Sequence, residues 1–271
     1  MRFWSFPIVI LLMGVSLAHG ASRFEEEDLW RQGKKDLAEG KANSARAALE
    51  VLLQEYPKEP DLHLILAMTS LKLGDARQAE VHIRRALKLA PDHVEARTLL
   101  GWVTLEVHKD FPAAIEAYRR VVQLRPNSAE AQNNLAVALK QNGDLDKALE
   151  GFNRAVDLRE GYAEAWSNRG WVHLEQEKWR EARRDFEQAL RLNPEDQGAL
   201  YGLARVLKQA RDYSGAQEAL KILISRSPNF VYWLEMAQLQ LVRYYWVLLL
   251  IAGGFLVHSK YRKMRAKNYG S

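Results

Sequence analysis

Seven histidines are the side chains of this chain best suited to metal binding or proton transfer, but their spacing supports neither role. They are His19, His63, His82, His93, His108, His173 and His258. None of them forms the His-Glu-x-x-His pattern that places two metal ligands on one helical face. The chain has no cysteine, which removes disulfides, thiolate nucleophiles and zinc-thiolate sites, and no glycine-rich loop precedes a helix to hold a phosphate. We therefore expect no catalytic residue, no metal site, no cofactor and no enzymatic activity.

Two recurring groups of side chains are better suited to binding another protein. The tripeptide Gly-Trp-Val occurs around Trp102 and again around Trp171, and indole side chains are frequent anchors of interfaces. Asn134 and Asn168 occupy equivalent positions 34 residues apart, and an amide can both donate to and accept from the backbone of an extended ligand. The alternatives are that the indoles pack between neighbouring helices and that the asparagines have a structural role only.

These side chains recur because most of the chain repeats with one period. A proline slot returns after 34, 35, 34, 34 and 34 residues, at Pro57, Pro91, Pro126, Glu160, Pro194 and Pro228. An alanine lies twelve residues before each slot, at Ala45, Ala79, Ala114, Ala148, Ala182 and Ala216. A large apolar residue follows four later, at Leu49, Ile83, Tyr118, Phe152, Phe186 and Leu220. Residues i and i+4 share one face of a helix, so the alanine admits a neighbouring helix and the larger residue fills the remaining space. A fixed period of this length indicates a stacked array.

Each period is predicted to form two short helices joined by a turn. Turn-forming residues recur at one slot, at Gly40, Gly74-Asp75, His108-Lys109-Asp110, Gly143-Asp144, Glu177-Lys178 and Arg211-Asp212. The proline slot then ends the second helix. The third unit carries one extra residue between His108 and Pro112, which accounts for the single spacing of 35, and Pro112 suits the first turn of a helix. A length of 271 residues with only eight prolines agrees with an all-α array.

The pattern resembles the tetratricopeptide repeat family, whose consensus runs Trp, Leu-Gly, Tyr, then Ala, Phe, Ala and Pro over 34 positions. The fifth unit matches it best, with Trp166, Gly170, Ala182, Phe186, Ala189 and Pro194 on consensus slots. Arg169 and His173 depart from the consensus leucine and tyrosine, and the first unit is the most degenerate, with Gln32 and Asp36 at core slots. The predicted units span residues 24–57, 58–91, 92–126, 127–160, 161–194 and 195–228.

The resemblance implies a right-handed superhelical solenoid with a concave groove lined by the first helix of each hairpin. Extended peptides or partner helices commonly bind in such grooves. The family's groove positions fall in this chain on Trp102, Asn133, Asn134, Asn168, Trp171, Tyr201, Arg205 and Lys208. Arg205 and Lys208 could meet a carboxylate, but the family's carboxylate-clamp spacing is not reproduced, so a chaperone-tail binder is not expected.

The N-terminus has the three parts of a secretory signal peptide. Arg2 precedes an apolar run from Phe6 to Leu17, and small residues follow at Ala18 and Gly20. We expect residues 1–20 to be removed by cleavage after Gly20. The alternative is an uncleaved anchor, and either version exports the array.

The C-terminal region is predicted to contain a capping helix at 229–242, a transmembrane helix at 243–260 and a basic tail at 261–271. The uninterrupted apolar run from Tyr244 to Val257 is 14 residues long, which at about 1.5 Å per residue gives about 21 Å and is marginal for a span. Flanking charges and aromatic residues extend it, including Arg243, Trp246 and Lys260. The alternative is a last core helix of the array.

The basic residues that follow the predicted transmembrane helix predict its orientation in the membrane. The predicted cytoplasmic tail carries Lys260, Arg262, Lys263, Arg265 and Lys267 and no acidic residue among them. These five charges equal the net charge of the whole chain, +5, so the high isoelectric point reflects the tail. A nucleic-acid binder carries its basic patch on the folded module, so we expect no nucleic-acid partner.

These features predict a membrane-anchored, non-enzymatic scaffold that presents its groove outside the cytoplasm. It would sit in the inner membrane by one span, with the array on the periplasmic side, and bind a peptide or helix of partner proteins during assembly of envelope complexes. Two alternatives stay open. One is a coat protein that self-associates through the sixth unit and Phe230 to Leu241, and the other is a tail-anchored adaptor with a cytosolic array.

Overall fold

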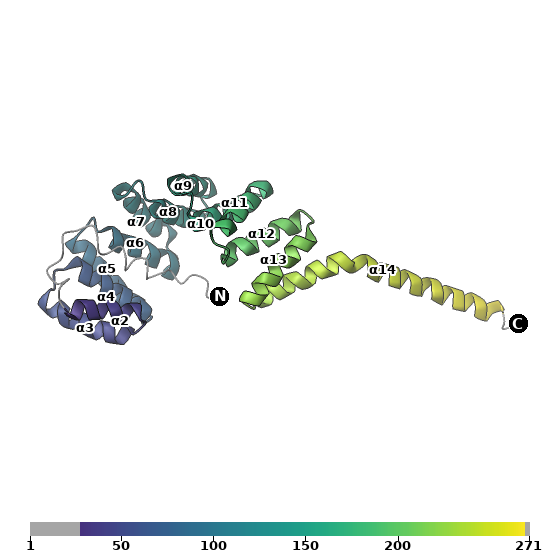
Figure 1. The fold of residues 1–271 in the computed structure, drawn as a ribbon, viewed down its shortest axis with the longest axis horizontal. Coiled ribbons are helices and arrows are strands. Elements are labelled where there is room, and N and C mark those ends of the chain that lie inside the picture. Colours follow the sequence, from purple (N-terminus) through teal and green to yellow (C-terminus); the bar gives the residue numbers. More distant parts are fainter. Residues whose placement is uncertain (1–27, 269–271) are drawn as a thin grey trace. The chain divides into compact units, whose positions relative to one another are not determined.

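The structure, a computed structural model, describes residues 28–268, and every regular element in that range is a helix (Figure 1). The predicted signal peptide at 1–20 lies outside the described residues. The described residues form two compact units, with the boundary between Arg159 and Glu160.

The first unit holds four helical hairpins. They are α2 (Asp28–Ala38) with α3 (Ala42–Glu55), α4 (Pro60–Lys72) with α5 (Ala76–Leu89), α6 (Val94–Trp102) and η1 (Val103–Val107) with α7 (Phe111–Leu124), and α8 (Ala129–Gln141) with α9 (Leu145–Leu158). The second unit holds two hairpins and a long helix. They are α10 (Ala163–Glu175) with α11 (Trp179–Leu192), α12 (Gln197–Gln209) with α13 (Tyr213–Arg226), and α14 (Phe230–Asn268).

The repeated alanine and the large residue four positions later form the core of every hairpin. All six alanines are fully buried, and none of their six large partners is more than 2% exposed. A helical glycine faces the large residue in several hairpins. A Cβ added to Gly101 or Gly170 would lie only 2.7 or 2.8 Å from the ring of Tyr118 or Phe186. Glycine is therefore required where the two helices approach most closely.

The turn inside each hairpin places one residue in the left-handed region. Glycine supplies it in three hairpins, at Gly40, Gly74 and Gly143, whereas the other three use Lys109, Glu177 and Arg211 at φ between 56° and 61°. This is the common way for a helix to end, because the left-handed residue lets the next amides bond back to the last turn. Asp75, one residue after Gly74, then caps α5 by accepting a hydrogen bond from the amide of Gln78.

The extra residue of the third unit lies inside its first helix and not in the turn. After Trp102 the helix widens into one π-helical turn, Val103–Val107, in which the amide of His108 donates to the carbonyl of Val103 at 3.1 Å. A π turn absorbs one additional residue without breaking the helix. Pro112 lies in the first turn of α7, as predicted.

The C-terminal region differs from the prediction. A single helix, α14, runs without interruption through the segments predicted as a capping helix and a membrane helix. Its first part packs on α13 through the buried side chains of Tyr232 and Leu239. The predicted transmembrane helix is not supported: of the helices within residues 28–268, none combines the length and the apolar character that crossing a bilayer requires. The apolar run without its polar and charged flanks is only 14 residues long.

Candidate protein-binding surface

Three aromatic rings from successive first helices form a row in the second unit. The ring centroids of Trp171 on α10 and Tyr201 on α12 lie 6.2 Å apart, and those of Tyr201 and Tyr232 on α14 lie 5.3 Å apart. We call Trp171, Tyr201 and Tyr232 the aromatic row. These distances are typical of aromatic pairs, so the three rings form one continuous row, in which Trp171 and Tyr201 are half-buried and Tyr232 is buried.

Close packing beneath the row holds its first two members. Trp171 follows Gly170, Tyr201 precedes Gly202, and both glycines face the buried ring of Phe186. The Trp171 ring also meets Phe186 edge to face at 5.5 Å. Because Phe186 fixes the spacing of α10 and α12, the same packing sets the spacing of Trp171 and Tyr201.

Charged groups border the aromatic row. The guanidinium of Arg205 lies 5.8 Å from the Trp171 ring centroid and is exposed, and within the described part of the chain it makes no ion pair. Lys208 instead pairs with Glu235 of α14 at 3.3 Å, and the Tyr201 hydroxyl donates to the same carboxylate at 2.9 Å. Burial, followed by the hydrogen bond to Glu235 and its negative charge, raises the pKa of Tyr201 to about 12. Arg205 is thus the cation of this surface that a partner's carboxylate can reach.

The predicted amide positions are less open than expected. The side chain of Asn168 is only 8% exposed, and its neighbour Ser167 is also buried. The structure therefore brings Trp171, Tyr201, Arg205 and Lys208 together on one surface but places Asn168 mostly beneath it.

The predicted groove residues of the first unit form a separate set. Trp102 is half-buried and packs against the core of that unit. Asn133 is fully buried, so it is not available to a ligand in this conformation, whereas Asn134 is half-buried. Only Trp102 and Asn134 of this set present accessible side chains.

Sequence reasoning missed two residues that contact this surface, Tyr232 and Glu235. Both lie on α14, outside the six-unit pattern, so no consensus slot pointed to them. A weak signal existed for Glu235, because it lies 34 residues after Tyr201, which is one repeat period.

Beneath the surface, a buried ionic cluster explains the two departures of the fifth unit from the repeat consensus. Arg169 Nη2 lies 2.6 Å from Asp185 Oδ1, and His173 Nδ1 lies 2.9 Å from Asp185 Oδ2. The Asp185 side chain is 3% exposed. Arg169 also lies over the Trp166 ring, 4.5 Å from its centroid. The cluster joins α10 to α11 and has a structural role.

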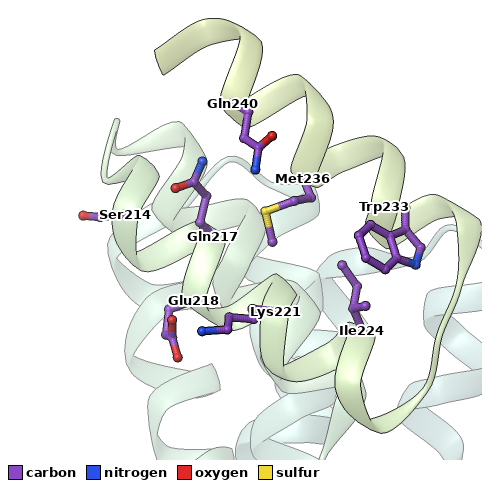
Figure 2. Close-up of a pocket in the computed structure, with 8 residues that line it drawn as sticks. All are labelled: Ser214, Gln217, Glu218, Lys221, Ile224, Trp233, Met236 and Gln240. Atoms are coloured by element: carbon purple, nitrogen blue, oxygen red, sulfur yellow. The ribbon is translucent and has the colours of Figure 1, made fainter. Parts of the chain in front are cut away.

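A shallow pocket lies between α13 and α14 (Figure 2). Its apolar part is formed by Ile224, Trp233 and Met236, and its polar part by Ser214, Gln217, Glu218, Lys221 and Gln240. Figure 2 shows Met236 pointing from α14 toward α13, with Trp233 beside Ile224. Among the described residues, no group of three or more histidine, cysteine, aspartate or glutamate side chains could hold a metal ion.

Comparison with known proteins agrees with the repeat architecture. The chain is 26% identical to the type IV pilus assembly protein PilF of Pseudomonas aeruginosa over 160 residues, which are 58% of this chain and 63% of that protein. It therefore matches less than two thirds of that relative's length. A solved structure of Pseudomonas aeruginosa PilF superposes with a TM-score of 0.69 at 18% identity, covering 78% of this chain and 95% of that one. A crystal structure of PilW, a widely conserved type IV pilus biogenesis factor, gives 0.68 at 16% identity, covering 75% and 94%. These structural similarities establish the fold alone.

Two family models match most of the array. A tetratricopeptide repeat model matches residues 36–103, and the model of the tetratricopeptide repeat protein 21 N-terminal ARM repeat matches residues 113–247. Together with the stacked hairpins, these matches support the assignment of the chain to the tetratricopeptide repeat family.

Proposed function

We propose that this chain is a non-enzymatic scaffold that binds a segment of a partner protein at the accessible end of the aromatic row, formed by Trp171 and Tyr201. The observation that supports this proposal most directly is the aromatic row with the exposed Arg205 beside it. Aromatic rings lose little conformational entropy on binding, and an arginine held over an indole is a typical interface anchor. An extended segment or helix with an apolar side chain and a nearby carboxylate fits this surface.

The cellular role that we propose is assembly of an envelope complex, of which a type IV pilus is one example. The support is the similarity to PilF and PilW, which are described as pilus assembly and biogenesis factors. Export of the array rests on the predicted signal peptide. Protease added to intact spheroplasts degrades an exported array and spares a cytosolic one, and sparing would reject this location.

We also propose that the far part of α14 attaches the array to a membrane. Large apolar side chains there are exposed, including Leu250 at 67%, Phe255 at 72% and Val257 at 70%. An exposed apolar surface of this kind marks a contact with protein or lipid. Lys260 and Arg262 follow it and suit anionic headgroups.

Photo-crosslinking in cells tests the binding surface directly. A crosslinking amino acid replaces Trp171 in the full chain, and the matched control places it at the exposed Val81 of α5. We expect capture of a defined envelope protein from position 171 only, and weaker capture when Arg205→Glu is added. Equal capture from both positions, or no effect of Arg205→Glu, would reject the aromatic row as the binding surface.

A further inference from the structure

Two histidines of the second hairpin form a direct ring-to-ring hydrogen bond. His63 Nδ1 on α4 lies 3.1 Å from His82 Nδ1 on α5, and the ring centroids are 5.4 Å apart. His63 is only 6% exposed, and His82 is half-buried. The contact therefore joins the two helices of one hairpin through groups that titrate near neutral pH.

The backbone carbonyl of Pro57 determines which of the two rings donates the hydrogen of this bond. His63 Nε2 lies 3.2 Å from the carbonyl oxygen of Pro57, and a carbonyl only accepts. Nε2 of His63 must therefore carry hydrogen, which leaves a lone pair on Nδ1 of the neutral ring. His82 Nδ1 then donates to that lone pair. The pair thus ties α4 both to α5 and to the segment after α3.

Additional protons do not fit this arrangement. A first extra proton puts a positive charge on the pair in a mostly buried position, which is unfavourable without a counter-charge. A second proton puts hydrogen on both Nδ1 atoms, so two N–H groups face each other at hydrogen-bonding distance. The ring-to-ring bond is then lost.

The charged groups around the pair offer little compensation. Arg46 and Glu50 face it from α3, and Arg85 faces it from α5. Glu50 is the one acid acting on the pair among the described residues, and its Oε1 already accepts from Arg46 Nε at 2.7 Å. Burial first, and then Arg85, lower the pKa of His63. Burial first, and then His63, lower the pKa of His82.

The pKa of His93, which precedes α6 and contacts α4, shifts in the opposite direction. His93 lies against Asp61 at 2.9 Å and against Glu95 at 3.3 Å. Burial alone would lower its pKa, but the hydrogen bonds to both carboxylates raise it to about 9. On α5, Glu80 is engaged by Arg84 and His108. His93 therefore keeps its charge through the range in which the His63–His82 pair titrates.

We propose that the His63–His82 pair is an acid-sensitive latch, which holds the second hairpin closed at neutral pH and releases it as both rings become protonated. Release separates α4 from α5 and weakens the contact of α4 with the first hairpin. Because α4 is buried continuously from Leu62 to Ser70, its loosening exposes a large apolar surface. The N-terminal hairpins would then respond to acid while the hairpins of the second unit do not.

The sign of the effect follows from linkage. The pKa values of both rings in the folded chain lie below the ordinary 6.5. Stability from the neutral pair is therefore present above pH 6.5 and is lost as pH falls below it, because the opened state binds more protons.

Hydrogen exchange on the full chain at pH 7.5 and 5.5, corrected for the intrinsic exchange rate, tests the latch. We expect protection of α4 and α5 to fall more than that of α12 and α13, by up to about tenfold for each ring, because pH 5.5 lies one unit below the ordinary histidine pKa. An equal change in both regions would overturn the proposal.

A double variant, His63→Leu with His82→Leu, removes both rings without leaving either unpaired. We expect it to keep its protection at neutral pH and to lose the excess acid sensitivity, whereas the control His108→Gln keeps that sensitivity. An acid sensitivity that survives in the double variant would contradict the latch. Should this variant fail to fold, an NMR titration of the histidine rings in the unmodified chain decides. Titration of His63 at or above pH 6.5 would exclude the latch.

Discussion

Polar residues at core slots of the repeat are paired with one another in this protein. Arg169 and His173, which replace the consensus leucine and tyrosine, both bind the buried Asp185. In the first hairpin, Asp36 accepts hydrogen bonds from Gln32 at 2.7 Å and Ser44 at 2.5 Å. A buried polar group is tolerated only when its partners accompany it, so these substitutions depend on each other.

Removing Asp185 alone should therefore destabilise the folded protein far more than replacing all three residues of the cluster. We expect Asp185→Ala to lower the free energy of unfolding by about 3–5 kcal/mol, because Arg169 loses its counter-charge in a mostly buried position. The triple variant Asp185→Ala, Arg169→Leu, His173→Tyr should recover most of that loss. Urea unfolding of the full chain measures both. The exposed Asp157→Ala is the control, and a similar loss there would contradict the argument.

A second residue on which stability depends is Gly202, where two helices pack closely. A Cβ on Gly202 would overlap the ring of Phe186. We expect Gly202→Ala to destabilise the protein by about 1–3 kcal/mol despite the better helix propensity of alanine, because the core is overpacked. Gly161→Ala, where the added methyl meets nothing within 4 Å, should be nearly neutral. Thermal unfolding of the two variants gives the comparison, and equal melting temperatures would refute it.

At the scale of the element, three hairpin turns carry avoidable strain. Lys109, Glu177 and Arg211 adopt the left-handed conformation that glycine adopts in the other three hairpins. We expect Glu177→Gly and Arg211→Gly each to stabilise the protein by about 1 kcal/mol, since a Cβ there costs about 1–2 kcal/mol. The reverse change, Gly74→Ala, should destabilise it. The melting temperature reports all three, and a loss of stability in either glycine variant would contradict this expectation.

An ionic network joins successive hairpins around His93. The ring binds Asp61 of α4 and Glu95 of α6, and Arg125 after α7 binds Glu95 at 2.8 Å. The Ala96 amide lies 3.4 Å from Nδ1 of the same ring, but a protonated ring has no lone pair to accept from it. The charged ring therefore acts as a bridge between carboxylates and not as a helix cap.

Stability from this network should fall in alkali. Because the pKa of His93 is raised from 6.5 to about 9, its contribution is complete below pH 6.5 and is lost as pH rises through about 9. The loss is up to about 3 kcal/mol. We expect the unmodified chain to lose more stability between pH 7 and 9.5 than His93→Gln does. Urea unfolding at the two pH values measures this, and parallel losses would disprove it.

At the scale of the whole molecule, only the first part of α14 packs against the helical array. Glu235 and Tyr232 bind α12, whereas the exposed side chains from Leu249 to Val257 contribute nothing to the array. We expect Leu250→Gln with Leu256→Gln to leave the melting temperature unchanged and to abolish flotation with anionic lipid vesicles. Flotation that persists in this variant would rule out membrane attachment through α14.

Much of the architecture could be predicted from the sequence. The alanine at each repeated slot and the large residue four positions later depend on local helical geometry, and all twelve are buried. The turn slots were also visible, although three use residues other than glycine. The π turn after Trp102 was not predictable, because one extra residue can enter a loop or a helix at similar cost.

The candidate surface was only partly predictable. Trp171, Tyr201, Arg205 and Lys208 came from family positions, and the structure places them together. Tyr232 and Glu235 were missed because they lie on α14, which follows the six repeats and matches no consensus slot. The burial of Asn133 and Asn168 depends on how tightly neighbouring helices pack, which spacing alone does not report.

The sequence by itself determined the period, the helix pairs and the residues between them, because these depend on contacts within a few residues and on a pattern repeated six times. Only the tertiary structure decided which polar groups meet. Asp185 with Arg169, Glu235 with Lys208 and His63 with His82 lie 16 to 27 residues apart. Such partners are chosen by the approach of two helices and by the cost of leaving a buried charge or donor unpaired.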